Sequence, residues 1–282
     1  MKHTDDALTA KEQRLRAIIR GYGRCIVAFS GGVDSALVVA IAAQELGHHA
    51  LAVTGVSASL PRREREAAVT LARALGARHE LLGTNELEDE RYAANPANRC
   101  YFCKSELYGR LIGSAHERGF ATIADGLNGD DLAEIRPGRL AATEHGVCSP
   151  LADAAFTKAD VRALALSLGL GVWDKPAMAC LASRFPTGTA ITDELLERVE
   201  RAEDVLVAAG FFDCRVRHHG DIARIEIPPD DFARLLRARD AIVTGVQAAG
   251  YRYVALDLGG YVRGGVAARP AHTNVIDLVS PH

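Results

Sequence analysis

The sequence contains 282 residues, of which 48% are hydrophobic and 24% are charged, and its formal net charge is −3. This length allows two domains with separate cores. The acidic balance disfavours bulk electrostatic binding to DNA or RNA. No apolar run approaches the length of a membrane span, and the charged first residues lack the hydrophobic core of a secretory signal. We therefore expect a cytoplasmic protein whose six cysteines serve as thiols, metal ligands or catalysts rather than as disulfides.

Short apolar runs alternate with helical patterns from residue 26 to about residue 170. The predicted strands are 26–29, 50–54, 79–82 and 122–124. The predicted helices are 36–47, 62–76, 104–118 and 158–169. This alternation predicts an α/β fold, in which a parallel sheet is flanked by helices on both faces.

A second unit follows an irregular stretch. Residues 171–190 contain Pro, Gly and small residues without a clean period, and we interpret them as a functional linker loop. The elements predicted after it are a helix at 191–209, strands at 214–219 and 222–227 joined by a hairpin turn, a helix at 230–249 and a strand at 251–257. The predicted domains are therefore 1–185 and a small α+β domain at 186–282.

The sequence SGGVDS at residues 30–35 lies between the first predicted strand and the first predicted helix. Glycines allow close approach of the backbone, and free N–H groups at a helix N-terminus attract anions. The loop lacks both the lysine of a Walker A motif and the spacing of a dinucleotide-binding fingerprint. The alternative is a simple glycine turn with Ser30 as the helix N-cap.

A second polar loop, ADGLNGDDLAEIRPG, follows the fourth predicted strand and contains Asp125, Asn128, Asp130 and Asp131. Such residues favour turns in any case, so a solvated turn is the simplest interpretation. Parallel strands, however, present their carboxyl ends at one edge of the sheet. At the same edge as the glycine-rich loop, this segment is a candidate for binding Mg²⁺ or substrate.

Three cysteines stand in a suggestive pattern. Cys100 and Cys103 form a C-x-x-C pair, and Cys180 lies in the linker loop. The pair alone is compatible with a redox couple, half of a zinc site or an iron–sulfur site. Three cysteines can hold a [4Fe–4S] cluster and leave one iron open. Buried structural thiols are the alternative, and they are the common role of a single cysteine such as Cys25.

The loop SGGVDS resembles the PP-loop of the ATP pyrophosphatase superfamily, which has an adenine nucleotide alpha hydrolase-like fold. These enzymes cleave ATP between its α and β phosphates and adenylate an oxygen atom. The resemblance implies bound ATP and Mg²⁺, with Asp34 and Asp131 near the metal ion. The residues it implies in binding ATP or pyrophosphate are Ser30, Gly31, Gly32, Asp34, Ser35, Thr54 and Gly126.

Five motifs together resemble the LarE family over most of residues 15–265. In chain order they are SGGVDS, NRCYFCK, DGLNGDDLAEIRPG, ACLASRFPTG and VRHHGDIARIEI. LarE proteins are ATP-dependent sulfur transferases that convert carboxylates of pyridinium-3,5-biscarboxylic acid mononucleotide to thiocarboxylates for a nickel-pincer cofactor. In one version of the family, the cysteine matching Cys180 gives up its own sulfur. In the other, a [4Fe–4S] cluster on three cysteines carries the sulfide, and Cys100, Cys103 and Cys180 match that version.

The same resemblance assigns substrate contacts. Arg215 and Arg217 match residues that bind the substrate phosphate, and alternate strand positions point to one face. Arginine suits this role because its planar fork pairs with phosphate. The remaining matched or plausible contacts are Lys104, Arg184, Glu200 and Glu226. Family resemblance also suggests a homo-oligomer.

The expected mechanism is adenylation of a carboxylate, with Cys100, Cys103, Cys180 and Asp34 as catalytic residues, followed by attack of sulfur at the acyl carbon. Sulfur is suited to this step because it is strongly nucleophilic near neutral pH. Three alternatives remain open from the residues. They are a PP-loop tRNA thiolase with a [4Fe–4S] cluster, an amide-forming PP-loop synthetase, and a non-enzymatic ATP-binding or zinc-stabilised module. The roles of Cys25, Cys148 and Cys214 are undetermined by the sequence.

Overall fold

The computed structural model describes residues 2–133, 137–176 and 179–261. The chain divides into two compact units, residues 1–200 and 201–282. The division falls inside helix α9 (Asp193–Ala208), fifteen residues beyond the boundary expected from the sequence at 185 and 186. That boundary stays a prediction, and residues 262–282 of the second expected domain lie outside the described part.

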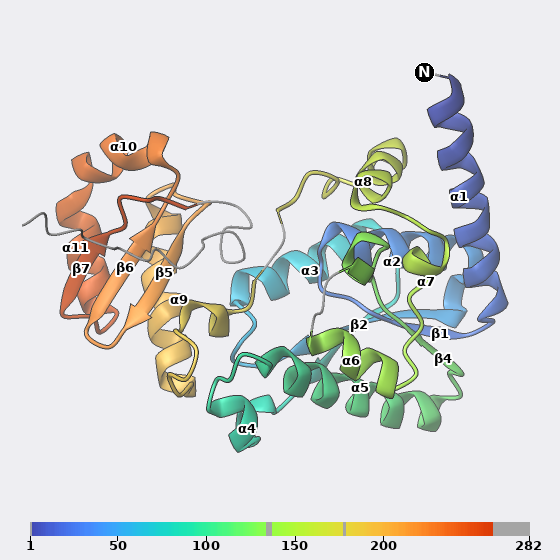
Figure 1. Cartoon of the computed structure of the whole chain (residues 1–282), viewed down its shortest axis with the longest axis horizontal. Helices are drawn as coiled ribbons and strands as arrows, with labels where there is room; N and C mark the ends of the chain where they lie inside the picture. Colours follow the sequence, from blue (N-terminus) through green and yellow to red (C-terminus); the bar gives the residue numbers. More distant parts are fainter. Residues whose placement is uncertain (1, 134–136, 177–178, 262–282) are drawn as a thin grey trace, which may run out of the picture. The chain divides into compact units, whose positions relative to one another are not determined.

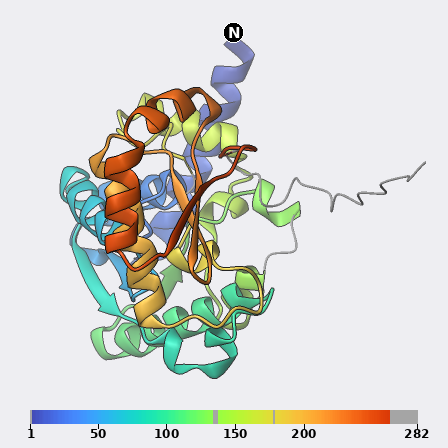
Figure 2. The ribbon, with the colours of Figure 1, turned by 90° about the vertical axis from the view of Figure 1, so that its left-hand side faces the viewer.

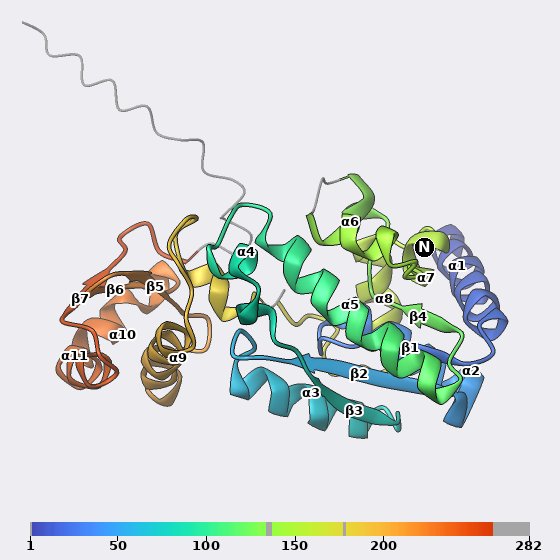
Figure 3. The ribbon, with the colours of Figure 1, turned by 90° about the horizontal axis from the view of Figure 1, so that it is seen from below.

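The first unit is built on a four-stranded parallel sheet, which confirms the predicted fold class (Figures 1 and 3). Its strands are β1 (Cys25–Ala28), β2 (Ala50–Val56), β3 (His79–Gly83) and β4 (Thr122–Ala124). The order is β3-β2-β1-β4, and Cys25 of β1 pairs with Ala50 on one side and with Thr122 on the other. The chain therefore places β2 and β3 on one side of β1 and then returns to place β4 on its other side, so the strand order reverses between β1 and β4.

Helices cover both faces of this sheet (Figure 3). One face packs against α1 (Lys2–Gly21), α2 (Val33–Leu46), α3 (Arg62–Ala74), α7 (Pro150–Asp153) and α8 (Lys158–Ser167). The other face packs against α5 (Arg99–Arg118) and α6 (Pro137–Glu144), and the single-turn α4 (Glu90–Ala93) precedes α5. Because α2 packs against both β1 and the helices around it, nearly all of its first nine residues are buried.

Short 3-10 helices connect several of these elements. They span Gly47–His49, Glu86–Glu88, Asp130–Ala133, Leu181–Arg184 and, in the second unit, Pro229–Asp231. In the described part of the chain, no helix combines the length and the apolar character needed to cross a bilayer.

The second unit is a small α+β fold (Figures 1 and 2). Its sheet contains β5 (Arg215–His219), β6 (Ile222–Glu226) and β7 (Tyr253–Leu256) in that order, with β5 antiparallel and β7 parallel to β6. The helices between β6 and β7 are α10 (Phe232–Arg237) and α11 (Arg239–Ala248). The sequence predicted one helix here, but the chain breaks at Ala238, where no Gly or Pro marks the change.

Candidate functional site

The loops after β1 and β4 meet at the point where the strand order reverses, which is where open α/β sheets bind ligands. Gly126, two residues after the end of β4, lies against the first turn of α2. A Cβ atom on Gly126 would approach the Ser35 backbone nitrogen to 2.6 Å. Only glycine allows this contact, so the backbone of the acidic loop closes directly over the glycine-rich loop.

Residues 30–32 of the SGGVDS motif form a compact turn, and its last three residues are the first three of α2. Gly32 is the N-cap of α2 and brings no side chain to its first-turn N–H groups. Ser30 is therefore not the N-cap, and its hydroxyl instead accepts the Gly32 N–H at 3.4 Å and lies 3.1 Å from the Ser35 hydroxyl. Gly31 has a φ of +73°, a conformation that favours glycine. The loop thus presents the N-terminus of a long helix at the carboxyl edge of the sheet.

Asp34 lies on the first turn of α2 and connects three segments. Its carboxylate accepts a hydrogen bond from Asn128 Nδ2 at 3.1 Å and forms an ion pair with Lys158 at the start of α8. Within the acidic loop, the Asp131 carboxylate accepts the Asn128 N–H at 3.2 Å. The structure therefore brings Asp34 and Asp131 to the same network. Lys158 was not identified from the sequence, because only the packing of α8 brings it to this loop.

Asp125 is buried beside this network. Its carboxylate accepts hydrogen bonds from Ser149 Oγ at 2.8 Å, from the Leu127 N–H at 3.0 Å and from the Tyr108 hydroxyl at 3.3 Å. Burial raises the pKa of Asp125, while these bonds and the nearby Lys104 ammonium partly oppose the shift. Asp125 therefore shapes the acidic loop from beneath, and Lys104 lies close enough to act on it electrostatically.

Lys175 reaches the glycine-rich loop from the linker segment. Its ammonium donates to the Gly31 carbonyl oxygen at 3.3 Å and to Glu64 of α3 at 3.1 Å. Six residues later, the Leu181 N–H donates to the Ser59 carbonyl oxygen at 2.9 Å, just beyond the end of β2. Cys180 thus lies between two contacts to the carboxyl edge of the sheet. The sequence analysis did not identify Lys175.

The three predicted cysteines come from two segments. Cys100 and Cys103 lie in the first two turns of α5, and Cys180 is the N-cap of the 3-10 helix Leu181–Arg184. Burial raises the pKa of Cys103 to about 12 and also raises that of Cys180. Cys100 lies near enough to contribute to both shifts, whereas the Arg99 cation opposes the shift at Cys180. The structure therefore gathers the three thiols in one electrostatic neighbourhood.

Buried polar residues support the strand ends beneath these cysteines. Glu86 is 3% exposed and accepts hydrogen bonds from Ser57 Oγ at 2.5 Å and from Thr84 Oγ1 at 2.9 Å. The hydroxyls of Ser59 and Tyr92 lie 2.7 Å apart. Glu86 contributes to the raised pKa of Cys103, so it lies near that thiol. A single acidic residue in a polar stretch gave no signal in the sequence.

Two other predicted site residues have partners that define their position. Arg184 is only 2% exposed and donates to the carbonyl oxygens of Ala179 and Cys180 at 2.8 and 2.9 Å, so it shapes the turn that carries Cys180. Thr54 is buried in β2, donates to the Phe29 carbonyl oxygen at 2.8 Å and lies 2.9 Å from His79 Nε2. Their proposed contacts with substrate and ATP stay predictions.

Glu200, the last residue of the first unit, lies at the N-terminus of α3. Its carboxylate accepts the Arg62 backbone N–H at 2.5 Å and lies 3.4 Å from the Arg62 side chain. A carboxylate at this position complements the positive end of the helix dipole. This is the position of Glu200 within its own unit, and its role toward a substrate stays a prediction.

In the second unit, Arg215 and Arg217 lie on one face of β5, while Val216 between them is buried. Arg217 donates two hydrogen bonds to Glu226 at 3.0 and 2.9 Å, and Arg224 pairs with the same carboxylate at 3.2 Å. The Arg215 guanidinium stacks over the Tyr261 ring at 4.9 Å. The structure thus brings the predicted Arg217 and Glu226 together within a larger cluster of arginines.

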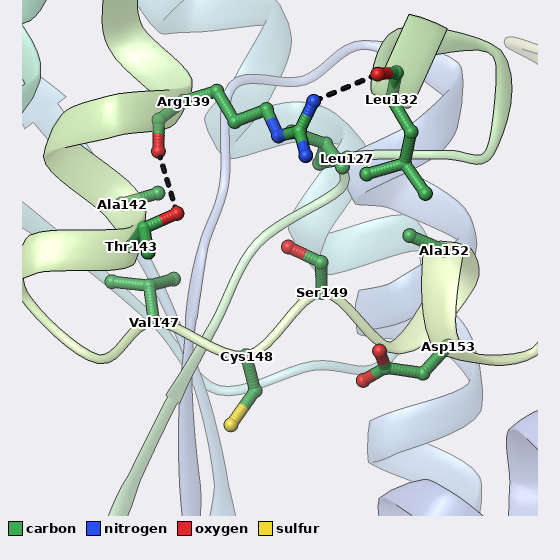
Figure 4. Close-up of a pocket in the computed structure, with 10 residues that line it drawn as sticks. All are labelled: Leu127, Leu132, Arg139, Ala142, Thr143, Val147, Cys148, Ser149, Ala152 and Asp153. Carbon is green, nitrogen blue, oxygen red and sulfur yellow. Dashed lines mark hydrogen bonds between the residues drawn. The ribbon is translucent and has the colours of Figure 1, made fainter.

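A pocket of about 270 Å³ lies between α6, the segment 147–149 and α7 (Figure 4). Cys148 lines this pocket, but its sulfur points away from the other labelled side chains (Figure 4), and burial and the Asp153 carboxylate raise its pKa. Arg139 closes one side by donating to the Leu132 carbonyl oxygen at 2.8 Å. Cys25 and Cys214 are buried in the cores of their own units, at 1% and 0% exposure. Their surroundings identify Cys25 and Cys214 as core residues.

Within residues 2–133, 137–176 and 179–261, no three His, Cys, Asp or Glu side chains converge as ligands of a single metal ion. For Mg²⁺ this is compatible with a nucleotide site, because Mg²⁺ usually takes one or two carboxylates and completes its shell with phosphates and water. A [4Fe–4S] cluster binds each thiolate on a different iron, so its ligands need not converge on one point. The three cysteines and Asp34 fit these groups by donor chemistry.

The sequence is similar to several known proteins. Residues 16–96 match the asparagine synthase family model. The chain is 40% identical over 258 residues to a pyridinium-3,5-bisthiocarboxylic acid mononucleotide synthase of Lactiplantibacillus plantarum. The aligned region covers 91% of this chain and 94% of that protein. It is 46% identical over 259 residues to an uncharacterised protein of Synechocystis sp., with coverages of 91% and 97%. A third relative, an uncharacterised protein of Methanocaldococcus jannaschii, is 28% identical over 235 residues, with coverages of 83% and 89%.

Proposed function

The chain belongs to the LarE family of pyridinium-3,5-bisthiocarboxylic acid mononucleotide synthases, and on this premise we propose that it is an ATP-dependent sulfur transferase. Its substrate in this proposal is pyridinium-3,5-biscarboxylic acid mononucleotide, whose carboxylates become thiocarboxylates for a nickel-pincer cofactor. The observation that carries the proposal is the position of Cys180. Lys175 on one side of it contacts the glycine-rich loop, and Leu181 on the other contacts the end of β2.

The first half-reaction uses the loop residues of the first unit. A substrate carboxylate oxygen attacks the α-phosphorus of ATP, and pyrophosphate leaves. The loop N–H groups and the start of α2 stabilise the charge that develops on the leaving pyrophosphate. Asp34 would hold Mg²⁺ once its ion pair with Lys158 opens, and Lys158 would then be available to the phosphates. The product is an acyl-adenylate, which turns an unreactive carboxylate into an electrophile.

The second half-reaction uses the cysteine site. A sulfur nucleophile held at Cys100, Cys103 and Cys180 adds to the acyl carbon, and AMP leaves. When bound to these thiolates, a [4Fe–4S] cluster with one open iron would supply the transferable sulfide. If no cluster binds, the proposed donor is the Cys180 thiol itself, whose Sγ forms a thioester with the acyl carbon as AMP leaves. A base then removes the Cα proton, the Cβ–Sγ bond breaks, the thiocarboxylate leaves and dehydroalanine remains. In both versions Arg184 keeps Cys180 in its turn.

In this proposal, Arg215 and Arg217 bind the phosphate of the mononucleotide. Arginine forks suit phosphate, and release of Arg217 from Glu226 would make its donors available. Glu200, Glu226 and Lys104 contribute the remaining charges near the substrate. We also propose a homo-oligomeric enzyme, as expected from the family resemblance, and a cytoplasmic location, as expected from the sequence.

The deciding experiment is anaerobic incubation with ATP, Mg²⁺ and the biscarboxylated mononucleotide, followed by mass spectrometry of product and protein. We expect each converted carboxylate to gain the mass of sulfur in place of oxygen, together with AMP and pyrophosphate. Iron and sulfide in the purified protein support the cluster version, whereas dehydroalanine at residue 180 after turnover supports the sacrificial version. Formation of AMP without any thiocarboxylate contradicts sulfur transfer, and salt-sensitive binding of bulk tRNA in a gel shift would favour the tRNA thiolase instead.

A further inference from the structure

Asn95 is an unusual residue for a loop position. It is 0% exposed, and its φ of +53° lies in the left-handed region, where among non-glycine residues of the described chain only Ala155 joins it. This conformation is costly for most side chains, and asparagine tolerates it better than others. Such residues persist where their neighbours hold them, and they concentrate at functional sites.

The neighbours of Asn95 come from the segment that follows Cys180. Asn95 Nδ2 donates to the Pro186 carbonyl oxygen at 2.8 Å, and the Asn95 carbonyl oxygen accepts the Gly188 N–H at 2.8 Å. Asn95 Oδ1 accepts a hydrogen bond from Arg99. Every polar group of this buried side chain is therefore used, as burial requires.

Arg99 extends the same connection toward Cys180. It is the first residue of α5, directly before Cys100, and its Nη1 also donates to the Ala182 carbonyl oxygen at 3.2 Å. Arg99 thus joins the helix end that carries the C-x-x-C pair to the 3-10 turn that carries Cys180. The Arg184 bonds to residues 179 and 180, in contrast, shape that turn from within.

We propose that Asn95 and Arg99 are positioning residues that hold residues 180–188, the Cys180 segment, against the start of α5. The inference rests on the proposed sulfur-transfer function of the three cysteines and adds to it two residues whose hydrogen bonds reach Pro186 and Ala182. The Arg99 cation also acts electrostatically on Cys180. They bring the two halves of the cysteine site together before any ligand binds. Their loss separates the Cys180 segment from Cys100 and Cys103 and leaves the glycine-rich loop intact.

The test begins with Asn95→Gly. Glycine keeps the left-handed backbone and the carbonyl that accepts the Gly188 N–H, so the substitution removes only the side-chain bonds. Arg99→Met provides a second variant, which removes the hydrogen bonds that Arg99 donates to Asn95 and to the Ala182 carbonyl oxygen. Asn95→Asp keeps the acceptor for Arg99 and loses the donor to Pro186, so it should be intermediate. Asn85→Gly is the matched control, because Asn85 is exposed and its side chain bonds to the nearby Glu88, while glycine keeps the backbone N–H that donates to Glu106.

The first readout is hydrogen exchange of the purified protein without ligands. In Asn95→Gly and Arg99→Met, amides of residues 181–188 should exchange about tenfold faster, whereas those of α2 should keep their wild-type rates. A general loss of stability would raise exchange in both places. Unchanged exchange at 181–188 in both folded variants overturns the proposal, and so does an equal increase in α2.

The second readout separates the two half-reactions. Substrate-dependent ATP–pyrophosphate exchange should remain within about twofold of wild type, while thiocarboxylate formation falls by about tenfold or more. Equal losses in both half-reactions overturn a positioning role specific to sulfur transfer. If the wild-type protein forms no thiocarboxylate, the proposed function fails, and the hydrogen-exchange result still decides whether Asn95 and Arg99 hold the segment.

Discussion

The ammonium of Lys175 lies 3.3 Å from the carbonyl oxygen of Gly31, the first glycine of the phosphate-binding loop proposed for this protein. Lys175 also stands five residues before Cys180 in the sequence. One segment therefore brings a positive charge to the loop and carries a cysteine of the proposed sulfur site. The relation gives a physical link between nucleotide binding and the position of Cys180.

Replacing Lys175 by methionine should weaken ATP binding. Methionine keeps an unbranched chain but removes the charge beside the loop and the hydrogen bond to the Gly31 carbonyl oxygen. A hydrogen bond to a charged group contributes about 1.5–3 kcal/mol. We therefore expect the KM for ATP to rise by about tenfold or more. The measurement is substrate-dependent ATP–pyrophosphate exchange at varied ATP. Lys11→Met is the control, since Lys11 pairs with Asp160 on the surface. An unchanged KM would remove Lys175 from the nucleotide site.

Gly126→Ala should disrupt the contact between the two loops. The new Cβ would lie 2.6 Å from the Ser35 nitrogen and 2.9 Å from its Cα, and backbone atoms cannot move aside cheaply. We expect a loss of about 1–3 kcal/mol in stability, together with weaker ATP binding. Thermal unfolding and ATP titration measure the two effects. Gly113→Ala in α5 meets no atom within 4 Å and should instead stabilise the protein slightly, as alanine does in helices.

Asp160 should make the stability of the first unit depend on pH in acid. Burial opposes the charge of Asp160, but hydrogen bonds from Lys11 and Thr157 outweigh it and hold its pKa below the usual value. Because the folded-state pKa lies below the unfolded value of about 3.9, the stabilisation is complete above about pH 5 and is lost as the pH falls through the unfolded and then the folded-state pKa. Asp160→Asn should cost about 1 kcal/mol at pH 7, through the capping box of α8.

Urea unfolding at pH 7 and at pH 3 measures this difference. The gap between wild type and Asp160→Asn should narrow at pH 3, because the Asp160 carboxylate of the unfolded chain is then largely protonated. Asp240→Asn, whose side chain is 91% exposed, should leave the unfolding midpoint unchanged at both values. A gap that widens in acid would contradict the assigned direction of the pKa shift.

Alkylation should distinguish the structural cysteines from Cys100. Burial raises the pKa of Cys25 to about 12, and both Cys25 and Cys214 are inaccessible, so iodoacetamide should not label them in the folded protein. Cys100 is exposed and should react first in protein free of metal. Peptide mass spectrometry before and after addition of urea measures the order. Rapid labelling of Cys25 without urea would show that the sheet opens around β1.

The sequence predicted the central sheet closely because its strands are short apolar runs between turn residues. β4 has the predicted bounds 122–124, and β2 continues two residues beyond the predicted end at 54. Among the predicted helices of the first unit, α3 and α8 begin at the predicted residues 62 and 158, whereas α2 and α5 begin earlier than predicted. α5 begins at Arg99, five residues before the predicted start, because the polar sequence NRCYFCK has no apolar period. α1 was not predicted, since few of its residues face the core.

The residues of the candidate site divide in the same way. Cysteines and a glycine-rich turn carry a local signal, so Ser30 to Ser35 and the three cysteines could be identified directly. Lys158, Lys175 and Asn95 carry none, because a single lysine or asparagine is ordinary on a surface. Their importance arises only from contacts across long stretches of sequence.

By itself, the sequence determined the chemistry that is available: a glycine-rich loop after a strand, an acidic loop after another, and three thiols in two segments. The tertiary structure decided which of these groups meet. The parallel sheet brings the ends of β1 and β4 together, and the left-handed turn at Asn95 connects the two cysteine segments. The reason is physical: residue type sets what a side chain can bind, whereas long-range packing and hydrogen bonding set what lies within its reach.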